Sequence, residues 1–144
     1  MKIIVRSILL LLLGLNATLA WSESSKEVGG YIVHFNALPT EALPPQVAKA
    51  YHITRSKNRG LLNISVLKKG KDFKAVEADI DVTATNLANQ MRPIKLRKIE
   101  EQNALYYIGE FRVSNEETLN FKIRVKTPDG EQETIQLTQQ FFVD

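Results

Sequence analysis

The sequence predicts an all-β protein, an immunoglobulin-like antiparallel β-sandwich of about seven strands with a short helix inserted after the first strand. Three observations lead to this fold class. Apolar and polar residues alternate with a period of two in several short segments, as in strands that bury one face and expose the other. Turn-forming residues separate these segments. The expected domain, residues 28–144, is long enough to hold such a sandwich.

Residues 1–20 have the three parts of a secretory signal peptide. Lys2 and Arg6 supply the positive charge, an uninterrupted leucine run occupies residues 9–13, and small Ala20 suits a cleavage site. The apolar run ends at Asn16, well short of the roughly 20 residues that cross a bilayer. We expect cleavage after Ala20 and a soluble product, periplasmic or secreted, with no membrane span.

Cleavage would leave 124 of the 144 residues, which is the length of one domain. Lys2 and Arg6 account for two of the 19 basic residues, so 17 remain against 16 acidic ones, a net charge of +1. This near balance argues against nucleic acid as a partner. The chain has no cysteine, which excludes disulfides, a lipidated N-terminus and thiol nucleophiles.

The elements follow a polar leader at residues 21–27 that we expect to be loosely held. The predicted strands are 31–36, 62–67, 77–84, 94–97, 105–113, 119–126 and 135–143. Pro128, Asp129 and Gly130 are strong turn formers and predict a hairpin between the last two strands.

Two of the predicted strands carry opposite charges on their polar faces. Acidic residues alternate along one strand and basic residues along another, and these are Glu77, Asp79, Asp81, Lys122, Arg124 and Lys126. Carboxylates that point into water do not acquire the shifted pKa values of a catalytic pair. We therefore interpret the two faces as cross-strand charge pairs between neighbouring strands.

Residues 38–53 interrupt the strand pattern. Proline in the first turn predicts a short helix over residues 44–51, in which Val47, Ala50 and Tyr51 share a face that would cover one end of the sandwich. The basic connection at residues 54–60 is longer than an ordinary hairpin loop, and long loops often carry function.

The segments 31–37, 45–51 and 55–66 resemble the DUF4426 family, small exported proteins of proteobacteria without an assigned function. Their sequences are YIVHFNA, PQVAKAY and RSKNRGLLNISV. The resemblance covers about residues 30–67, and the later strands match only in general character. It implies a periplasmic β-sandwich and supplies no catalytic residue.

The candidate contact surface lies on the long connection and its flanks. It consists of His34, Asn36, Tyr51, Arg55, Lys57, Asn58 and Arg59. Arginine side chains in this loop would suit a carboxylate or phosphate. The alternatives are a solvated loop, or an arginine that ties the loop to an acidic strand.

Metal binding and catalysis have little support in the sequence. His34 and His52 are the only histidines and have no recognised ligand spacing, and Met91 is the only methionine after Met1, too few soft ligands for a copper carrier. No serine lies in a nucleophile-elbow motif, and no glycine-rich phosphate loop occurs. We expect no metal, no cofactor and no enzyme activity.

The function that we expect is a protein-interaction or chaperone-like binding module with a periplasmic protein as partner. The alternative is a carrier of a small anionic ligand, held in a pocket beneath residues 38–53. The first would show an exposed apolar strip or an open sheet edge, and the second a concave pocket with converging polar groups.

Overall fold

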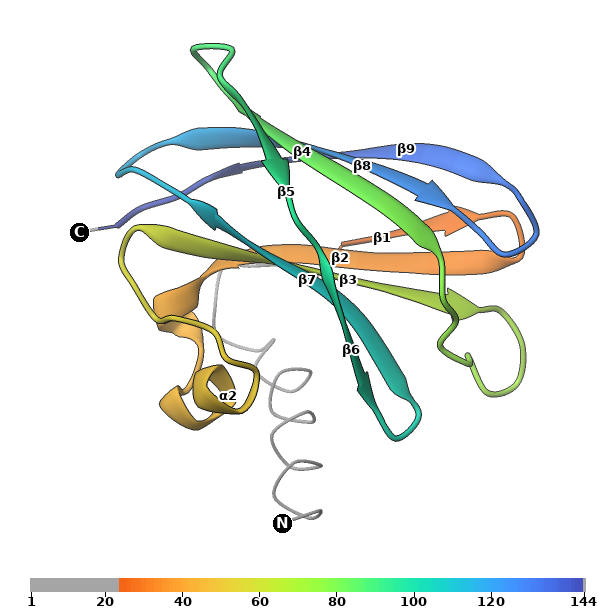
Figure 1. Ribbon diagram of the computed structural model, residues 1–144. Helices are drawn as coiled ribbons and strands as arrows, with labels where there is room; N and C mark the ends of the chain where they lie inside the picture. Colours follow the sequence, from red (N-terminus) through yellow and green to blue (C-terminus); the bar gives the residue numbers. More distant parts are fainter. Residues whose placement is uncertain (1–23, 144) are drawn as a thin grey trace.

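The computed structural model describes residues 24–143, which form two antiparallel sheets facing each other (Figure 1). The five-stranded sheet has the order β1-β2-β3-β7-β6 and the four-stranded sheet the order β5-β4-β8-β9. The strands are β1 (Ser24–Val28), β2 (Tyr31–Pro39), β3 (Arg59–Lys68), β4 (Asp79–Asn86), β5 (Met91–Ile94), β6 (Arg97–Glu101), β7 (Ala104–Arg112), β8 (Thr118–Lys126) and β9 (Gln132–Gln140). The predicted all-β sandwich is confirmed, with nine strands among the described residues instead of seven.

Residues 24–27 are the first departure from the prediction, because they form β1 and not a loose leader. Their backbone pairs with β2, in the register Lys26↔Val33. Their polar side chains suit an edge position, where Lys26 Nζ lies 3.2 Å from Glu133 Oε1 of β9 and Glu27 Oε2 lies 2.7 Å from Lys69 Nζ. The expected signal peptide, the cleavage site after Ala20 and residues 21–23 lie outside the described residues.

The segment 94–97 is the second departure, because it is not one strand. Ile94 ends β5 in the four-stranded sheet, and Arg97 begins β6 in the five-stranded sheet. The chain crosses from one sheet to the other between these residues, and Ile94 and Leu96 both pack on the main core although the strand pairing is broken between them.

The main core fills the space between the sheets. The apolar residues of the alternating strands point inward, and Val33, Leu62 and Ile123 are fully buried. At one end of the core Phe111, Phe121 and Phe141 pack edge to face, with ring centroids 5.0–6.3 Å apart. Such aromatic pairs add about 0.5–1.5 kcal/mol each beyond the burial of their area.

The predicted hairpin is confirmed, and the predicted charge pairing is confirmed in part, with an ion pair of 3.4 Å between Asp81 and Arg124. Lys126 pairs with Gln132 across the turn between β8 and β9, and Thr127 N donates to Glu131 O at 2.8 Å. β4 and β8 are neighbours in a register that places Asp79 opposite Lys126 and Asp81 opposite Arg124. Glu77 precedes β4 and contacts Lys98 of β6 instead.

The insertion after β2 consists of η2 (Thr40–Ala42) and α2 (Pro45–Ala50). It covers the outer face of the five-stranded sheet and not an end of the sandwich, as Figure 1 shows. Val47, Ala48 and Tyr51 face the sheet, whereas Ala50 is exposed. This second cluster consists of Leu38, Leu43, Val47, Ala48, Tyr51, Ile53, Leu61 and Ile108. Apolar positions on the outer faces of β2, β3 and β7 explain the location, since they need a cover.

None of the described helices has both the length and the hydrophobicity to cross a membrane.

We expect Gly60→Ala to destabilise the fold by about 1–3 kcal/mol, because overpacking a filled core has that cost. A Cβ atom at Gly60 would lie 2.3 Å from Cε2 of Phe111, its partner across β3 and β7. Gly30→Ala is the matched control, since a Cβ atom there meets nothing within 4 Å. Urea denaturation of both variants measures the effect, and equal midpoints would contradict this account of the core.

Candidate functional site

Tyr51, one of the candidate residues, joins the helical insertion to β6. Its hydroxyl donates to Glu101 Oε2 at 3.1 Å, and the Arg97 guanidinium donates to its carbonyl oxygen. Burial, followed by the hydrogen bond to Glu101, raises the pKa of the Tyr51 hydroxyl. Beneath residues 38–53 the described side chains form the apolar cluster described above, and the pocket expected at that place stays a prediction.

His34 and Asn36 lie half-buried on the outer face of β2. His34 is opposite Ser65, and Asn36 is opposite Asn63. Asn63 is four residues from Arg59 along β3, which corresponds to roughly 13 Å. The candidate residues therefore divide into two groups, and His34 and Asn36 do not share one site with the basic loop.

The basic loop is attached to the insertion at two points. Thr40 is fully buried, and its hydroxyl donates to Ser56 O at 3.1 Å and accepts from Ser56 N at 2.9 Å. Arg55 Nη2 donates to Glu41 O at 3.0 Å. Lys57 is exposed. Arg55 thus holds the loop in place, and Lys57 remains on the surface.

The end of the loop is attached to β7. Asn58 O accepts from Val113 N at 3.0 Å, and Arg59 begins β3 opposite Arg112. Nη1 of Arg59 lies 3.6 Å from Glu110 Oε1, close enough for an ion pair but too far for a hydrogen bond. This contact matches the alternative in which an arginine ties the loop to an acidic strand.

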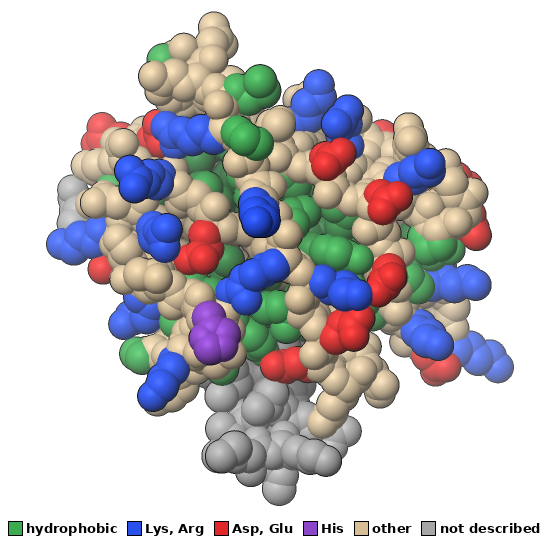
Figure 2. All heavy atoms as spheres, in the orientation of Figure 1, with side chains coloured by type: hydrophobic (Ala, Val, Ile, Leu, Met, Phe, Trp, Pro, Cys, Tyr) green, Lys and Arg blue, Asp and Glu red, His purple; other side chains and the backbone are tan. Residues whose placement is uncertain are grey.

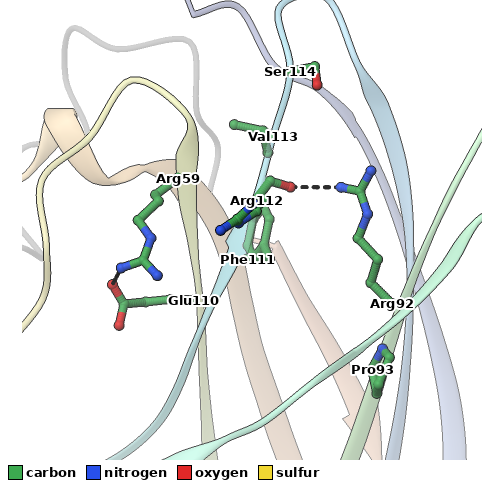
Figure 3. A pocket seen from close by; sticks show the side chains of 8 residues that line it. All are labelled: Arg59, Arg92, Pro93, Glu110, Phe111, Arg112, Val113 and Ser114. Carbon is green, nitrogen blue, oxygen red and sulfur yellow. Dashed lines mark hydrogen bonds and ion pairs between the residues drawn. The ribbon is translucent and has the colours of Figure 1, made fainter.

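A pocket of about 400 Å³ adjoins Arg59, and we call it the arginine pocket (Figure 3). It is lined by Arg59, Arg92, Pro93, Glu110, Phe111, Arg112, Val113 and Ser114, from β3, β5, β7 and the loop after β7. Its position follows from the crossing between β5 and β6. The pairing of β6 with β7 begins at Arg97↔Ile108, so the end of β7 extends beyond β6.

Gly109 permits that crossing. A Cβ atom at Gly109 would lie 2.4 Å from Cγ2 of Ile94 and 3.2 Å from the carbonyl oxygen of Lys95. Only glycine lets the crossing chain pass so close to β7, and Arg92 and Pro93 thereby form the second wall of the pocket (Figure 3).

Arg92 is fixed by three hydrogen bonds. Its guanidinium donates to both carboxylate oxygens of Glu117, at 3.0 and 2.9 Å, and to Arg112 O at 2.8 Å. The bonds from Arg92 are the main reason why the pKa of Glu117 is lowered, with further bonds from Asn86 and Ser114 N, while burial acts in the opposite direction. Arg92 is therefore a rigid wall of the pocket, with its charge already balanced.

Arg112 and Glu110 are the two other charged groups of the β7 wall. The Arg112 side chain is exposed, and among residues 24–143 its guanidinium has no ion-pair partner. It projects into the space between Arg59 and Arg92 (Figure 3). Oε1 of Glu110 is buried and has no hydrogen-bond partner. The pocket thus offers an uncommitted cation beside an unsatisfied carboxylate oxygen.

The hairpin between β4 and β5 lies next to the arginine pocket and is braced by Asn86. Asn86 Oδ1 accepts from Ala88 N and Gln90 N at 3.0 and 2.9 Å, and Asn86 Nδ2 donates to Gln90 Oε1 and Glu117 Oε2 at 2.8 and 3.3 Å. Leu87 and Met91 of this hairpin are 77% and 67% exposed. The hairpin protrudes from the sandwich in Figure 1, and Figure 2 shows hydrophobic side chains on it above a group of Lys and Arg side chains.

Within the described part of the chain, no group of three or more His, Cys, Asp or Glu side chains is arranged to hold a metal ion.

Sequence reasoning missed most of the arginine pocket and the braced hairpin. The alternation along β7 does place Glu110 and Arg112 together on the polar face, opposite Phe111 and Val113. Their proximity to Arg59 depends on the pairing of β3 with β7, which brings together residues that are about fifty positions apart in the sequence. No local signal indicated that Arg92 would bind Glu117.

A family model described as a domain of unknown function, DUF4426, matches residues 25–144. The fold is similar to the crystal structure of a DUF4426 family protein from Pseudomonas aeruginosa, with a TM-score of 0.72, 32% identity, and coverage of 85% of this chain and 96% of that chain. No curated protein matches the chain.

Two structures of FetP from uropathogenic Escherichia coli strain F11 share the fold at low identity. A copper-bound variant has a TM-score of 0.57 and 9% identity, and covers 86% of this chain and 92% of its own. The as-isolated protein, recombinantly expressed in the periplasm of E. coli, has a TM-score of 0.52 and 10% identity, and covers 84% and 93%.

We expect Glu117→Gln to lower the free energy of unfolding at pH 7 by about 2 kcal/mol, the usual contribution of hydrogen bonds to a charged group. Because the pKa of Glu117 is lowered in the folded state, its contribution is present above the unfolded pKa near 4.5 and is lost as the pH falls through the folded pKa. The native sequence should therefore lose more stability than the variant when the pH falls from about 5 to about 3.

Glu116→Gln is the control, because Glu116 is the exposed neighbour of Glu117. Urea denaturation across this pH range compares the three proteins. Parallel pH profiles for the native sequence and Glu117→Gln would refute the role of the Arg92–Glu117 pair.

Proposed function

The chain belongs to the DUF4426 family, and we propose that this member is an exported protein-interaction module and not an enzyme. Its contact element is the braced β4–β5 hairpin. The partner is a protein of the same compartment that offers an apolar surface to Leu87 and Met91.

The exposure of Leu87 and Met91 is the observation that carries this proposal. Both side chains are more than two-thirds in water, on a hairpin that projects from the sandwich. Exposed apolar groups that gather at one place are typical of interaction sites. Methionine adapts to varied partner surfaces because its side chain is unbranched and polarisable.

The bracing of the hairpin supports the same function. Three hydrogen bonds of the Asn86 side chain hold the turn, and a fourth reaches Glu117, which is itself bound by Arg92. A contact element that is already ordered loses little conformational entropy when it binds.

The export part of the proposal rests on residues 1–20, with cleavage after Ala20. Positive charge, a leucine run and a small residue at the cleavage position are the usual features of a secretory signal. FetP, which shares the fold, was obtained from the periplasm of E. coli. Since FetP is only about 10% identical, the likeness concerns the fold alone, and copper is not part of this proposal.

We expect the double variant Leu87→Ser, Met91→Ser to fail to bind the partner protein. Its melting temperature should stay within about 2 °C of that of the native sequence, because exposed side chains contribute little to stability. A photo-crosslinking residue at position 87 should yield a discrete adduct in the native host, and the Met91→Ser change should weaken that adduct. The same substitutions at Phe73, which is 50% exposed in the loop after β3, serve as the control. Equal adducts at positions 73 and 87 would contradict the proposal.

We expect the protein recovered from the periplasm of its host to begin at Trp21, since Ala20 precedes the cleavage site. Intact mass spectrometry of the periplasmic and cytoplasmic fractions tests this. An Ala20→Gln variant, whose larger side chain does not suit the peptidase, should accumulate uncleaved. Full-length native protein in the cytoplasm would contradict export.

A further inference from the structure

We propose that the arginine pocket is a second binding site, for a small zwitterion. Its carboxylate and ammonium groups would be about 6 Å apart, as they are in an extended dipeptide. Short peptides with free ends are the class of ligand that it fits. The site is separate from the hairpin surface, and the proposal does not depend on the hairpin's partner.

The cationic half of the pocket is Arg112, and Arg59 lies beside it in an ion pair with Glu110. The Arg112 guanidinium is exposed and has no ion-pair partner among the described residues. Arg59 lies 3.6 Å from Glu110, so the donors of its Nη1 are not used in a hydrogen bond to that carboxylate. Guanidinium groups match the two oxygens of a carboxylate through paired N–H donors. The pocket therefore has donors available for one carboxylate.

The anionic half is Glu110. Its Oε1 atom is buried without a hydrogen-bond partner, which is a costly state for a charged oxygen. A ligand with only a negative charge would leave this oxygen unsatisfied and would be repelled by it. An ammonium group supplies the missing hydrogen-bond donor, which Arg59 at 3.6 Å does not supply. The charges on the pocket wall thus select a ligand with two opposite ends.

The spacing indicates the size of the ligand. Glu110 and Arg112 are two residues apart on one face of β7, which is about 6.6 Å along a strand. The ammonium and carboxylate of an extended dipeptide are separated by about 6 Å, whereas those of a single amino acid are about 3 Å apart. The pocket volume of about 400 Å³ lies within the range of small-ligand sites. A dipeptide can therefore reach both groups at once.

Arg92 makes the site rigid without taking part in it. Its guanidinium holds Glu117 and the Arg112 carbonyl oxygen, which fixes the backbone from which Arg112 projects. Pro93 and Val113 add apolar contact area on either side of the β7 wall. The side chains of Arg112 and Glu110 therefore project from a backbone that is already held in place before a ligand binds.

The test is a titration of the isotope-labelled protein with L-alanyl-L-alanine, followed by NMR. We expect saturable shifts at the amides of residues 110–114, and binding at least tenfold weaker for the dipeptide amide, which lacks the carboxylate. Arg112→Ala should weaken dipeptide binding at least tenfold without changing the melting temperature, because the side chain is exposed. Arg124→Ala, an exposed arginine on β8, is the matched control and should bind as the native sequence does.

Glu110→Gln separates a zwitterion site from a general anion site. In the native sequence the dipeptide should bind at least fivefold more tightly than its N-acetyl derivative, and Glu110→Gln should abolish this preference. Tight binding of inorganic phosphate, equal binding of the dipeptide and its amide, or an unaffected Arg112→Ala variant would each overturn the proposal. The Leu87→Ser, Met91→Ser variant should bind the dipeptide normally, so failure of one site does not imply failure of the other.

Discussion

The passage of the chain from β5 to β6 over Gly109 is the contact on which both candidate sites depend. It moves the chain from one sheet to the other at the point where the Ile94 side chain and the Lys95 carbonyl approach the β7 backbone. Because β6 then pairs with β7 only as far as Ile108, the end of β7 remains open beside Arg92. The same crossing ends β5 after four residues, and the turn between β4 and β5 projects from the sandwich (Figure 1). Any side chain at position 109 would push these segments apart.

Arg92 and Glu117 connect the two sites physically. The Arg92 guanidinium binds the β7 backbone at Arg112 O on one side, and Glu117 binds the Asn86 side chain of the hairpin on the other. Glu117 is only 13% exposed, so water screens the pair less than it screens an ion pair on the open surface. A single charge-assisted network therefore sets the geometry of the pocket wall and of the protruding turn.

Local periodicity sufficed for most of the fold, because alternation reports directly which strand face is buried. It did not find β1, since an edge strand needs only backbone pairing and tolerates polar residues such as Lys26 on both faces. It joined β5 to β6 because Ile94 and Leu96 both contact the core across the crossing. Of the candidate residues, Arg59 borders the pocket, whereas Arg112 and Glu110 become its neighbours only through strand pairing that no local pattern specifies.

The composition of the four edge strands has a consequence for the behaviour of the protein at high concentration. β1 carries Lys26 and Glu27, β6 is almost entirely charged, β5 is four residues long and contains Pro93, and β9 carries Glu133. Short, charged or proline-containing edges prevent strands of different molecules from pairing. These edges therefore protect the folded protein from edge-to-edge aggregation, and the chain has no cysteine through which molecules could crosslink instead.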